Sequence, residues 1–262
     1  MSERVNIITS FYTEVDEEQR LQKSRHGQLE FRTTMEYIHR LIPESARILE
    51  VGAGTGRYSI ALAKEGYEVT AIELLENNLE VLRENAQGIA NLQAFQGDAL
   101  DLDKWQDNTF DVTLVLGPMY HLYEKEQVHK AIDEAIRVTK KGGVIFFAFL
   151  SVYAILFNNY LKENLQDGIE ENFTEEYKVR HFEEQLFTGY DIAEFEALFA
   201  EKEVEYLSTV AANTILELAR KRTDFVMSDE DFEAFAKYHL ATCEKRELLG
   251  ASSHLLYICK KK

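Results

Sequence analysis

Residues 46–57 read ARILEVGAGTGR, an apolar segment that runs directly into three closely spaced glycines. The apolar run from Ala46 to Val51 predicts a short buried strand, and a helix is expected from Tyr58 to Lys64. The glycines between them are Gly52, Gly54 and Gly56. Glycines between a strand and a helix allow a tight turn and a close approach of the backbone to a ligand, so this loop is predicted to be a binding loop.

Strand and helix patterns alternate along the rest of the chain. The further predicted elements are the strand Glu68–Ile72, the helix Asn77–Asn85, the strands Leu92–Gln96 and Phe110–Leu116, the helix Lys125–Val138, the strand Val144–Phe149, the helix Ile192–Phe199, the strand Val204–Val210, the helix Asp229–Cys243 and the strand His254–Cys259. This order predicts an α/β fold with a doubly wound, parallel sheet and right-handed crossovers.

The flanking segments lead us to expect one domain over residues 1–262. Apolar residues recur at intervals of three and four from Glu17 to Ile42, which predicts helices ahead of the first strand. Within the domain we expect four parts, an N-terminal helical lid (1–45), a core (46–150), an insertion over the active site (151–190) and a C-terminal completion of the sheet (191–262).

Composition excludes several classes of protein. The net charge of −17 disfavours a nucleic-acid partner, which would require clustered Lys and Arg. Two cysteines, Cys243 and Cys259, are too few for a zinc cluster or a disulfide framework, so no metal is expected and a reducing cytoplasm is favoured. The longest apolar run, Val144 to Phe157, is shorter than the ~20 residues of a membrane span.

The glycine loop and the residue before it indicate a cationic ligand. The spacing is G-x-G-x-G, and Arg57 stands where a dinucleotide-binding loop would have its last glycine. Glu50, near the end of the strand, would repel a pyrophosphate but suits an ammonium and a sulfonium.

Two further acidic residues follow strands in the places where a nucleoside would need them. Glu73 comes 21 positions after Gly52, a spacing at which a carboxylate accepts from ribose hydroxyls in nucleoside-binding α/β folds. Asp98 follows the third strand and could accept from an adenine amino group. Glycines and acids together predict a nucleoside site.

Five segments in register resemble the successive motifs of class I S-adenosylmethionine-dependent methyltransferases. They are ILEVGAGTGRYSIALA, YEVTAIEL, FQGDALDL, FDVTLVLGPMYHL and RVTKKGGVIFFAF, and the resemblance covers about Arg47 to Leu150. It implies a Rossmann-like, seven-stranded sheet with six parallel strands and an antiparallel last strand at His254–Cys259. The N-terminal helices precede this sheet, and the insertion, which is expected to be helical, follows strand 5.

The same resemblance implies S-adenosylmethionine as cofactor, S-adenosylhomocysteine as product, and a set of cofactor contacts. The implied contacts are Glu50 and the backbones of Gly52, Gly54 and Gly56 with the methionine portion, Glu73 with the ribose, Leu74 and Ala99 with the faces of the adenine, Asp98 with the adenine amino group, and Leu116 and Gly117 beneath the sulfonium.

The methyl acceptor is expected beyond the carboxyl ends of the strands, near residues 117–121, GPMYH. His121 could act as a general base or could simply pack beside the next helix, and Tyr120 could hydrogen-bond the acceptor or be structural. GPMY is only faintly similar to the signature of amino-methylating DNA enzymes, and Gly117 lacks the side-chain acceptor that such enzymes need.

Aromatic and cationic groups near the N-terminus could close over the cofactor. Tyr12 and Arg20 are our candidates for cofactor binding, with Phe11, Arg25 and Arg32 as other members of a lid, although solvated arginines are the ordinary alternative. The aromatic residues of the insertion could form the roof of a pocket or pack conventionally. They are Tyr153, Phe157, Tyr160, Phe173, Tyr177, His181, Phe182 and Tyr190.

These observations predict transfer of a methyl group from S-adenosylmethionine to a small-molecule O, N or S acceptor by direct in-line displacement. A methyltransferase acting on RNA or protein, and a non-catalytic module that binds the cofactor, are the alternatives. A nicotinamide dehydrogenase is disfavoured by Arg57 and Glu50. The acceptor, its reacting atom and the choice between monomer and homodimer stay open.

Overall fold

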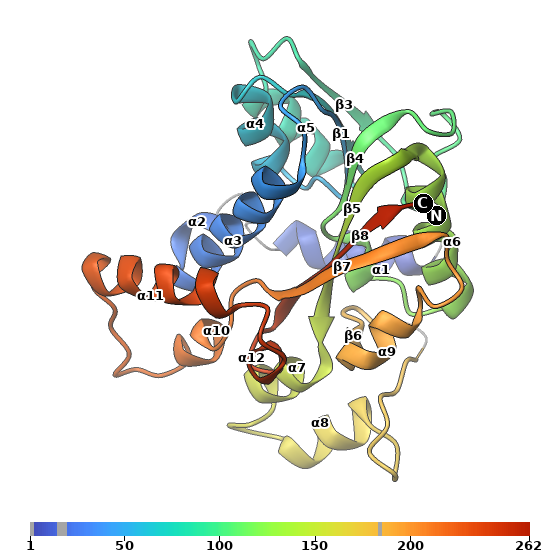
Figure 1. Ribbon diagram of the computed structural model, residues 1–262. Coiled ribbons are helices and arrows are strands. Elements are labelled where there is room, and N and C mark those ends of the chain that lie inside the picture. Colours follow the sequence, from blue (N-terminus) through green and yellow to red (C-terminus); the bar gives the residue numbers. More distant parts are fainter. Residues whose placement is uncertain (1–2, 15–19, 183–184) are drawn as a thin grey trace.

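The computed structural model describes residues 3–14, 20–182 and 185–262, with the side chains of residues 13, 14 and 20 outside the description. Its centre is a sheet in the order β3-β2-β1-β4-β5-β8-β7 (Figure 1). The strands are β1 (Arg47–Val51), β2 (Glu68–Glu73), β3 (Leu92–Gln96), β4 (Phe110–Val115), β5 (Thr139–Ser151), β6 (Gly189–Tyr190), β7 (Val204–Ala211) and β8 (His254–Lys261).

Strand directions confirm the predicted sheet. The pairs β1–β2, β1–β4, β2–β3 and β4–β5 are parallel, whereas β8 is antiparallel to both β5 and β7. Six long strands therefore run one way and the last strand runs the other. The two-residue strand β6, which pairs in parallel with the end of β5, was not predicted.

Helices cover both faces of this sheet, with α3, α4 and α5 on one side in Figure 1 and α6 and α9 on the other. The helices are α1 (Glu3–Glu14), α2 (Arg20–Lys23), α3 (Arg25–Leu41), α4 (Arg57–Lys64), α5 (Glu76–Asn85), the short 3₁₀ helix η2 (Pro118–Tyr120), α6 (Lys125–Val138), α7 (Val152–Asn159), α8 (Leu165–Asn172), α9 (Ile192–Ala197), α10 (Leu216–Ala219), α11 (Asp229–Thr242) and α12 (Arg246–Leu249). Because helices cover both faces, β1 and β4 are almost entirely buried.

The long strand β5 begins five residues before the predicted start. Its pairing with β4 is irregular, since Thr139 lies opposite Phe110 but Val144 already lies opposite Val112. The hydroxyl groups of Thr113 and Thr139 are 2.7 Å apart in the core and anchor this early part of the strand. Lysines and glycines interrupt the apolar pattern at the start of β5, so this part of the strand was not predicted.

The predicted N-terminal helical segment is divided at Ser24, whose Oγ accepts from the Gly27 N–H (3.2 Å) and caps α3. Arg25 and Arg32 of α3 form ion pairs with α11, the second to Glu233 at 2.7 Å. These two arginines therefore fasten α3 to α11 and do not line the cavity described below, contrary to a role in a lid.

The insertion is helical, as predicted, and consists mainly of α7 and α8. Its aromatic residues pack against one another or face solvent. Tyr153 stacks on Phe173 with ring centroids 5.9 Å apart, whereas the side chains of Phe157 and Tyr177 are 41% and 74% exposed. The predicted aromatic pocket roof is thus not formed by these side chains, and conventional packing accounts for those that are buried.

Within the described part of the chain, no helix is both long and apolar enough to cross a membrane. Cys243 and Cys259 are buried thiols, with no disulfide between them.

The irregular start of β5 gives a test of the fold. A Cβ on Gly143 would lie 2.7 Å from the Asp111 carbonyl oxygen and 2.9 Å from that of Lys140. Gly143→Ala is therefore expected to lower the free energy of unfolding by about 1–3 kcal/mol, measured by urea denaturation. Gly250→Ala is the control, because a Cβ there meets no atom within 4 Å. Equal stability of the two variants would contradict this packing.

Candidate functional site

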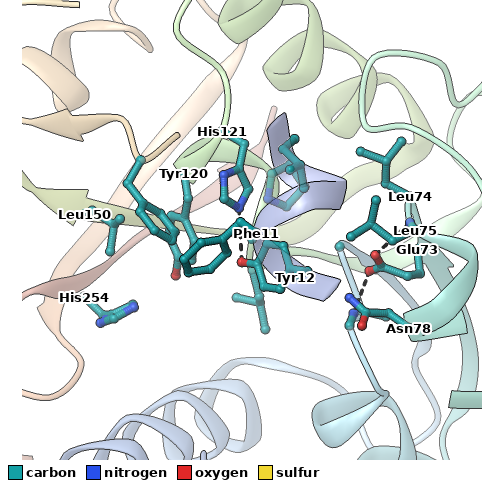
Figure 2. A pocket seen from close by; sticks show the side chains of 18 of the residues that line it. Phe11, Tyr12, Glu73, Leu74, Leu75, Asn78, Tyr120, His121, Leu150 and His254 are labelled. Carbon is teal, nitrogen blue, oxygen red and sulfur yellow. Dashed lines mark hydrogen bonds between the residues drawn. The ribbon is translucent and has the colours of Figure 1, made fainter. Parts of the chain in front are cut away.

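A cavity of about 550 Å³ opens at the carboxyl ends of β1, β2, β4 and β5, within the range of small-molecule sites. Figure 2 shows its two ends, with α1 between them. The residues labelled at the first end, here named the Glu73 end, are Glu73, Leu74, Leu75 and Asn78. Those at the opposite end, named the His121 end, are Tyr120, His121, Leu150 and His254.

The glycine loop is held against the end of β2. Backbone N–H groups of Gly52 and Ala53 both donate to the Ile72 carbonyl at 2.9 Å. Gly52 has φ of +78°, and a Cβ there would lie 2.6 Å from Cδ of Pro118. Only glycine allows the loop after β1 to lie this close to the loop after β4, and this approach forms the cavity floor.

Gly56 has a different role from the other two glycines. It precedes α4 with φ of +89°, and a Cβ there would lie 2.8 Å from Cγ of Leu82 on α5. Gly52 and Gly54 line the cavity, whereas Gly56 does not. Its absence of a side chain is required for the packing of α4 on α5.

Glu73 is the last residue of β2 and is 6% exposed. Its Oε2 accepts from the Gly54 N–H (2.7 Å) and its Oε1 accepts from the Leu75 N–H (3.0 Å). Two backbone donors orient the carboxylate at the cavity wall and join the loop after β1 to the loop after β2. Hydrogen bonds to an ionised acceptor are stronger than those between neutral groups.

Glu50 lies at the cavity wall in β1 and is 1% exposed. Burial raises the pKa of Glu50 to about 8; the hydrogen bond from the Ser59 hydroxyl opposes this shift and the charge of Glu73 adds to it. The carboxyl group is therefore mainly protonated at neutral pH. A cation beside it would favour its ionised form.

Asp98 follows β3 and already has two partners. Its Oδ1 accepts from the Leu100 N–H (3.1 Å), and its Oδ2 forms an ion pair with Arg4 of α1. The Arg4 side chain is only 8% exposed, so this pair fastens one end of α1 over the Glu73 end of the cavity.

Aromatic rings surround the His121 end. Phe11 of α1 meets Phe187 edge-on with centroids 5.1 Å apart, and Tyr12 meets His121 edge-on at 5.7 Å. The Tyr120 ring is 6% exposed and stands edge-on to His121. This end is therefore suited to an apolar, flat ligand.

His121 has both ring nitrogens engaged. Its Nδ1 lies 2.6 Å from the Leu186 carbonyl oxygen and must donate to it, since a carbonyl can only accept. Nε2 of the neutral ring is then an acceptor, and the Tyr12 hydroxyl donates to it at 3.2 Å. This second contact fastens the other end of α1 over the cavity.

Comparison with known proteins finds a family that resembles the central part of the chain. Residues 48–143 match the model of the family described as "Methyltransferase domain". The chain is 31% identical over 120 residues to a putative methyltransferase, YqeM, of Bacillus subtilis, covering 45% of this chain and 48% of that protein. It is 36% identical over 108 residues to a demethylmenaquinone methyltransferase of Staphylococcus aureus, covering 40% and 43%.

The fold agrees over the whole chain. The PH0226 protein of Pyrococcus horikoshii superposes with a TM-score of 0.62 at 16% identity, covering 97% of this chain and 99% of that one. A SAM-dependent methyltransferase of Methanosarcina mazei gives a TM-score of 0.56 at 17% identity, covering 86% and 96%. Residues 48–143 are thus similar in sequence to a methyltransferase domain, and the chain as a whole has the fold of S-adenosylmethionine-dependent methyltransferases. It spans less than half the length of the curated relatives that it matches.

The cavity brings together most residues that were predicted from the sequence to contact the cofactor. Those that line it are Tyr12, Glu50, Gly52, Gly54, Glu73, Leu74, Asp98, Ala99, Leu116 and Gly117, together with the acceptor candidates Tyr120 and His121. The side chain of Arg20, at the start of α2, lies outside the described residues. Among the described residues there is no group of three or more possible metal ligands.

Several cavity residues were not predicted from the sequence. They are Arg4, Asn78, Phe187, Glu217 and His254. None belongs to a motif, and each reaches the cavity through packing of α1, α5, α10, β8 or the segment before β6. His254 was recognised only as the first residue of the last strand.

Burial gives a test of the state of His121. Loss of solvation lowers the pKa of His121 to about 4, so the ring is expected to stay neutral throughout pH 5.5–8. NMR titration of the histidine ring protons, assigned with His121→Gln, should show no shift for His121 over this range. A His121 titration near pH 6.5 would contradict the burial of this ring.

Proposed function

We propose that this methyltransferase transfers a methyl group from S-adenosylmethionine to an oxygen, nitrogen or sulfur atom of a small molecule. One observation carries the proposal: a single cavity joins the Glu73 end, built from the family motifs, to an aromatic His121 end. Direct transfer requires donor and acceptor in contact, and a shared cavity provides for that.

Glu50 supplies the test of whether S-adenosylmethionine fits this cavity. Its carboxyl group is buried at the wall, and its described hydrogen-bond partner, the Ser59 hydroxyl, is neutral. A positively charged ligand would compensate for the burial of an ionised Glu50. S-adenosylmethionine carries an ammonium and a sulfonium, which an ionised Glu50 would attract. The same carboxylate would repel a pyrophosphate, so Glu50 favours S-adenosylmethionine as the ligand.

The cavity residues take the roles that the family resemblance implies. The proposed contacts are Glu73 with the ribose hydroxyls, Asp98 with the adenine amino group, Leu74 and Ala99 with the adenine faces, Glu50 and the backbones of Gly52 and Gly54 with the methionine portion, and Leu116 and Gly117 beneath the sulfur. Tyr12 and Arg20 are proposed to cover the methionine portion from the N-terminal side. Gly56 supports these contacts through the packing of α4.

S-adenosylmethionine, when bound, supplies a methyl group activated by a good, neutral leaving group. The protein then has to exclude water and hold the acceptor in line. Helix α1 is placed for the first task, because Arg4 ties it to Asp98 and Tyr12 ties it to His121. On this basis we assign α1, within the predicted N-terminal lid (1–45), to covering the cavity.

Tyr120 and His121 are proposed to orient the acceptor at the aromatic end. A general base works best with a pKa near the working pH, whereas burial holds the pKa of His121 at about 4. His121 is therefore assigned to positioning Tyr12 and the acceptor. A sulfonium donor makes strong base catalysis unnecessary for acceptors that are already nucleophilic.

A small-molecule acceptor is favoured over RNA or protein by three observations. The net charge is −17. The His121 end is enclosed by α1 and lined by apolar rings. The relatives named demethylmenaquinone methyltransferase have, by their name, a small-molecule acceptor.

Removal of the Glu73 carboxylate should abolish cofactor binding. Glu73→Ala is expected to weaken binding of S-adenosylmethionine and S-adenosylhomocysteine about 100-fold, because charge-assisted hydrogen bonds to the ribose are lost together with the anchor of the Gly54 loop. Isothermal titration calorimetry measures both ligands.

Glu76→Ala is the matched control, since Glu76 is an exposed carboxylate on α5 that pairs with Arg83. Failure of the unmodified protein to bind either ligand would refute the proposed function. When binding is present, release of S-adenosylhomocysteine in a screen of small hydroxyl, amine and thiol acceptors tests transfer itself.

Cofactor affinity should depend on pH through Glu50. The folded protein holds a proton on Glu50 up to about pH 8, whereas the ionised form attracts the cationic ligand. Binding below pH 8 must therefore release this proton, and affinity should rise by up to about tenfold per pH unit from pH 6 to 8, then level off.

Glu50→Gln cannot ionise and serves as the reference, since titration of the ligand itself affects both proteins equally. Calorimetry at several pH values should show a steeper dependence for the unmodified protein. Identical pH profiles would contradict the role of Glu50.

A further inference from the structure

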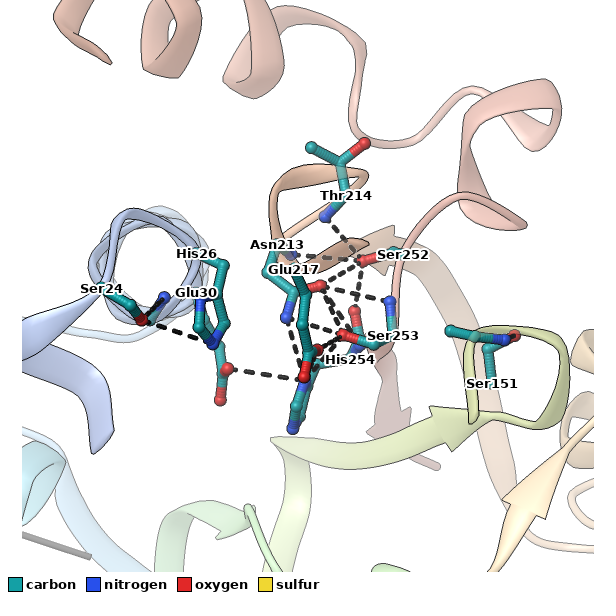
Figure 3. Close-up of polar contacts among 12 residues, drawn as sticks. Ser24, His26, Glu30, Ser151, Asn213, Thr214, Glu217, Ser252, Ser253 and His254 are labelled. Atoms are coloured by element: carbon teal, nitrogen blue, oxygen red, sulfur yellow. Dashed lines mark hydrogen bonds and ion pairs between the residues drawn. The ribbon is translucent and has the colours of Figure 1, made fainter. Parts of the chain in front are cut away.

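One wall of the His121 end is polar. Figure 3 shows this wall, which we call the His254 wall. It consists of Asn213, Glu217, Ser252, Ser253 and His254, and three of these residues, Glu217, Ser253 and His254, line the cavity. They come from the loop after β7, from α10 and from the start of β8, so the wall exists only in the folded chain.

The amide of Asn213 has a defined orientation. Its Oδ1 accepts from the Ser252 hydroxyl at 3.0 Å and from the backbone N–H groups of Ser253 and His254 at 3.2 and 3.3 Å. Those backbone groups can only donate, so the oxygen must face them. The Asn213 Nδ2 group then faces the His254 ring, with Nδ1 at 3.0 Å.

This contact determines where the hydrogen of a neutral His254 ring resides. An N–H of Asn213 can only donate, so Nδ1 carries the lone pair and Nε2 carries the hydrogen. Two carboxylates, of Glu30 and Glu217, lie farther from Nδ1, at 3.6 and 3.8 Å. If they hold the ring in its protonated form, Nε2 still carries a hydrogen. Nε2 is therefore a donor in either state.

The His254 donor has no partner within the described part of the protein. Every hydrogen bond or ion pair of the His254 ring there involves Nδ1, and Nε2 is not enclosed by the protein. The side chain is 16% exposed and lines the cavity. His121 differs, because both of its nitrogens are engaged.

Apart from Glu217 and Ser253 of the His254 wall itself, His254 has apolar neighbours in the cavity. The Tyr120 ring stands edge-on to it with centroids 5.6 Å apart, and Leu150, Ile155 and Phe187 line the same end. A polar donor beside such a surface selects a ligand with one hydrogen-bond-accepting atom on an apolar body.

We propose that the Nε2–H of His254 binds an oxygen of the methyl acceptor, that Asn213 fixes this donor, and that the acceptor is an apolar ring compound bearing a carbonyl or hydroxyl oxygen. The inference rests on the proposed function, since it assigns the acceptor within the same cavity. His254 is a specificity-determining residue here, and Asn213 is a positioning residue.

The hydrogen on Nε2 can be observed directly. Protein labelled with [¹⁵N]histidine and saturated with S-adenosylhomocysteine should give an Nε2 resonance of the protonated, pyrrole type for His254 at about pH 8.5, about two units above the ordinary histidine pKa. His254→Gln assigns the signal. An unprotonated Nε2 would overturn the proposal. Asn213→Asp replaces the donor by a carboxylate and should reverse the tautomer.

A matched pair of probes tests the ligand chemistry. 1-Tetralone carries one carbonyl oxygen, and tetralin is the corresponding hydrocarbon. The S-adenosylhomocysteine complex should bind 1-tetralone about three- to tenfold more tightly than tetralin, the effect of one hydrogen bond. His254→Phe and Asn213→Asp should remove this preference, whereas His254→Gln, whose amide can still donate, should retain part of it.

His39→Gln, a change at an exposed histidine of α3, is the control and should leave the preference unchanged. Equal binding of the two probes, or binding of neither, would overturn the assigned ligand class. Titration with S-adenosylhomocysteine alone separates the two proposals. Normal cofactor binding without the preference defeats only this inference, whereas loss of cofactor binding by the unmodified protein defeats the proposed function.

Discussion

The carboxylate of Glu73 connects the two loops on which the site depends. It accepts hydrogen bonds from the Gly54 N–H in the loop after β1 and from the Leu75 N–H in the loop after β2. Parallel strands end at the same edge of a sheet, and this carboxylate joins two adjacent ends. The glycine loop, the Pro118 loop packed on Gly52, and the cavity between them follow from that connection.

Helix α1 extends the same arrangement across the cavity. Arg4 and Tyr12 lie about two turns apart on α1 and contact Asp98 and His121 at opposite ends of the cavity. The position of α1 over the cavity therefore depends on Asp98, which we assign to the adenine, and on His121, which we assign to the acceptor. Glu50 contributes in another way, since the cost of burying its carboxyl group would be relieved by a cationic ligand.

The sequence predicted those parts of the molecule that depend on local pattern. The bounds of β3 and α6 agree with the predictions, and β1, β2, β4 and β7 differ by a residue or so, because buried apolar runs bounded by glycine or polar residues are visible in one dimension. The start of β5 was missed because Lys140 to Gly143 interrupt the apolar pattern at an irregular pairing. Gly56, which the family resemblance implies as a contact of the cofactor, does not line the cavity and lies close to Leu82 of α5.

Residues that reach the site through tertiary packing could not be predicted in this way. Arg4 lies more than ninety residues before its partner Asp98, and Asn213 lies 41 residues before His254. No periodicity or motif connects such pairs. They also determine what the sequence left open, namely how the cavity is covered and which acceptor chemistry it favours.

A crystal structure of the protein with S-adenosylhomocysteine would show whether a methyl-donor site spans the Glu73 end of the shared cavity. The ribose is expected at Glu73, the adenine between Leu74 and Ala99, and the sulfur above Leu116 and Gly117, facing Tyr120. Ligand density elsewhere, or with the nucleoside at the His121 end, would contradict this arrangement.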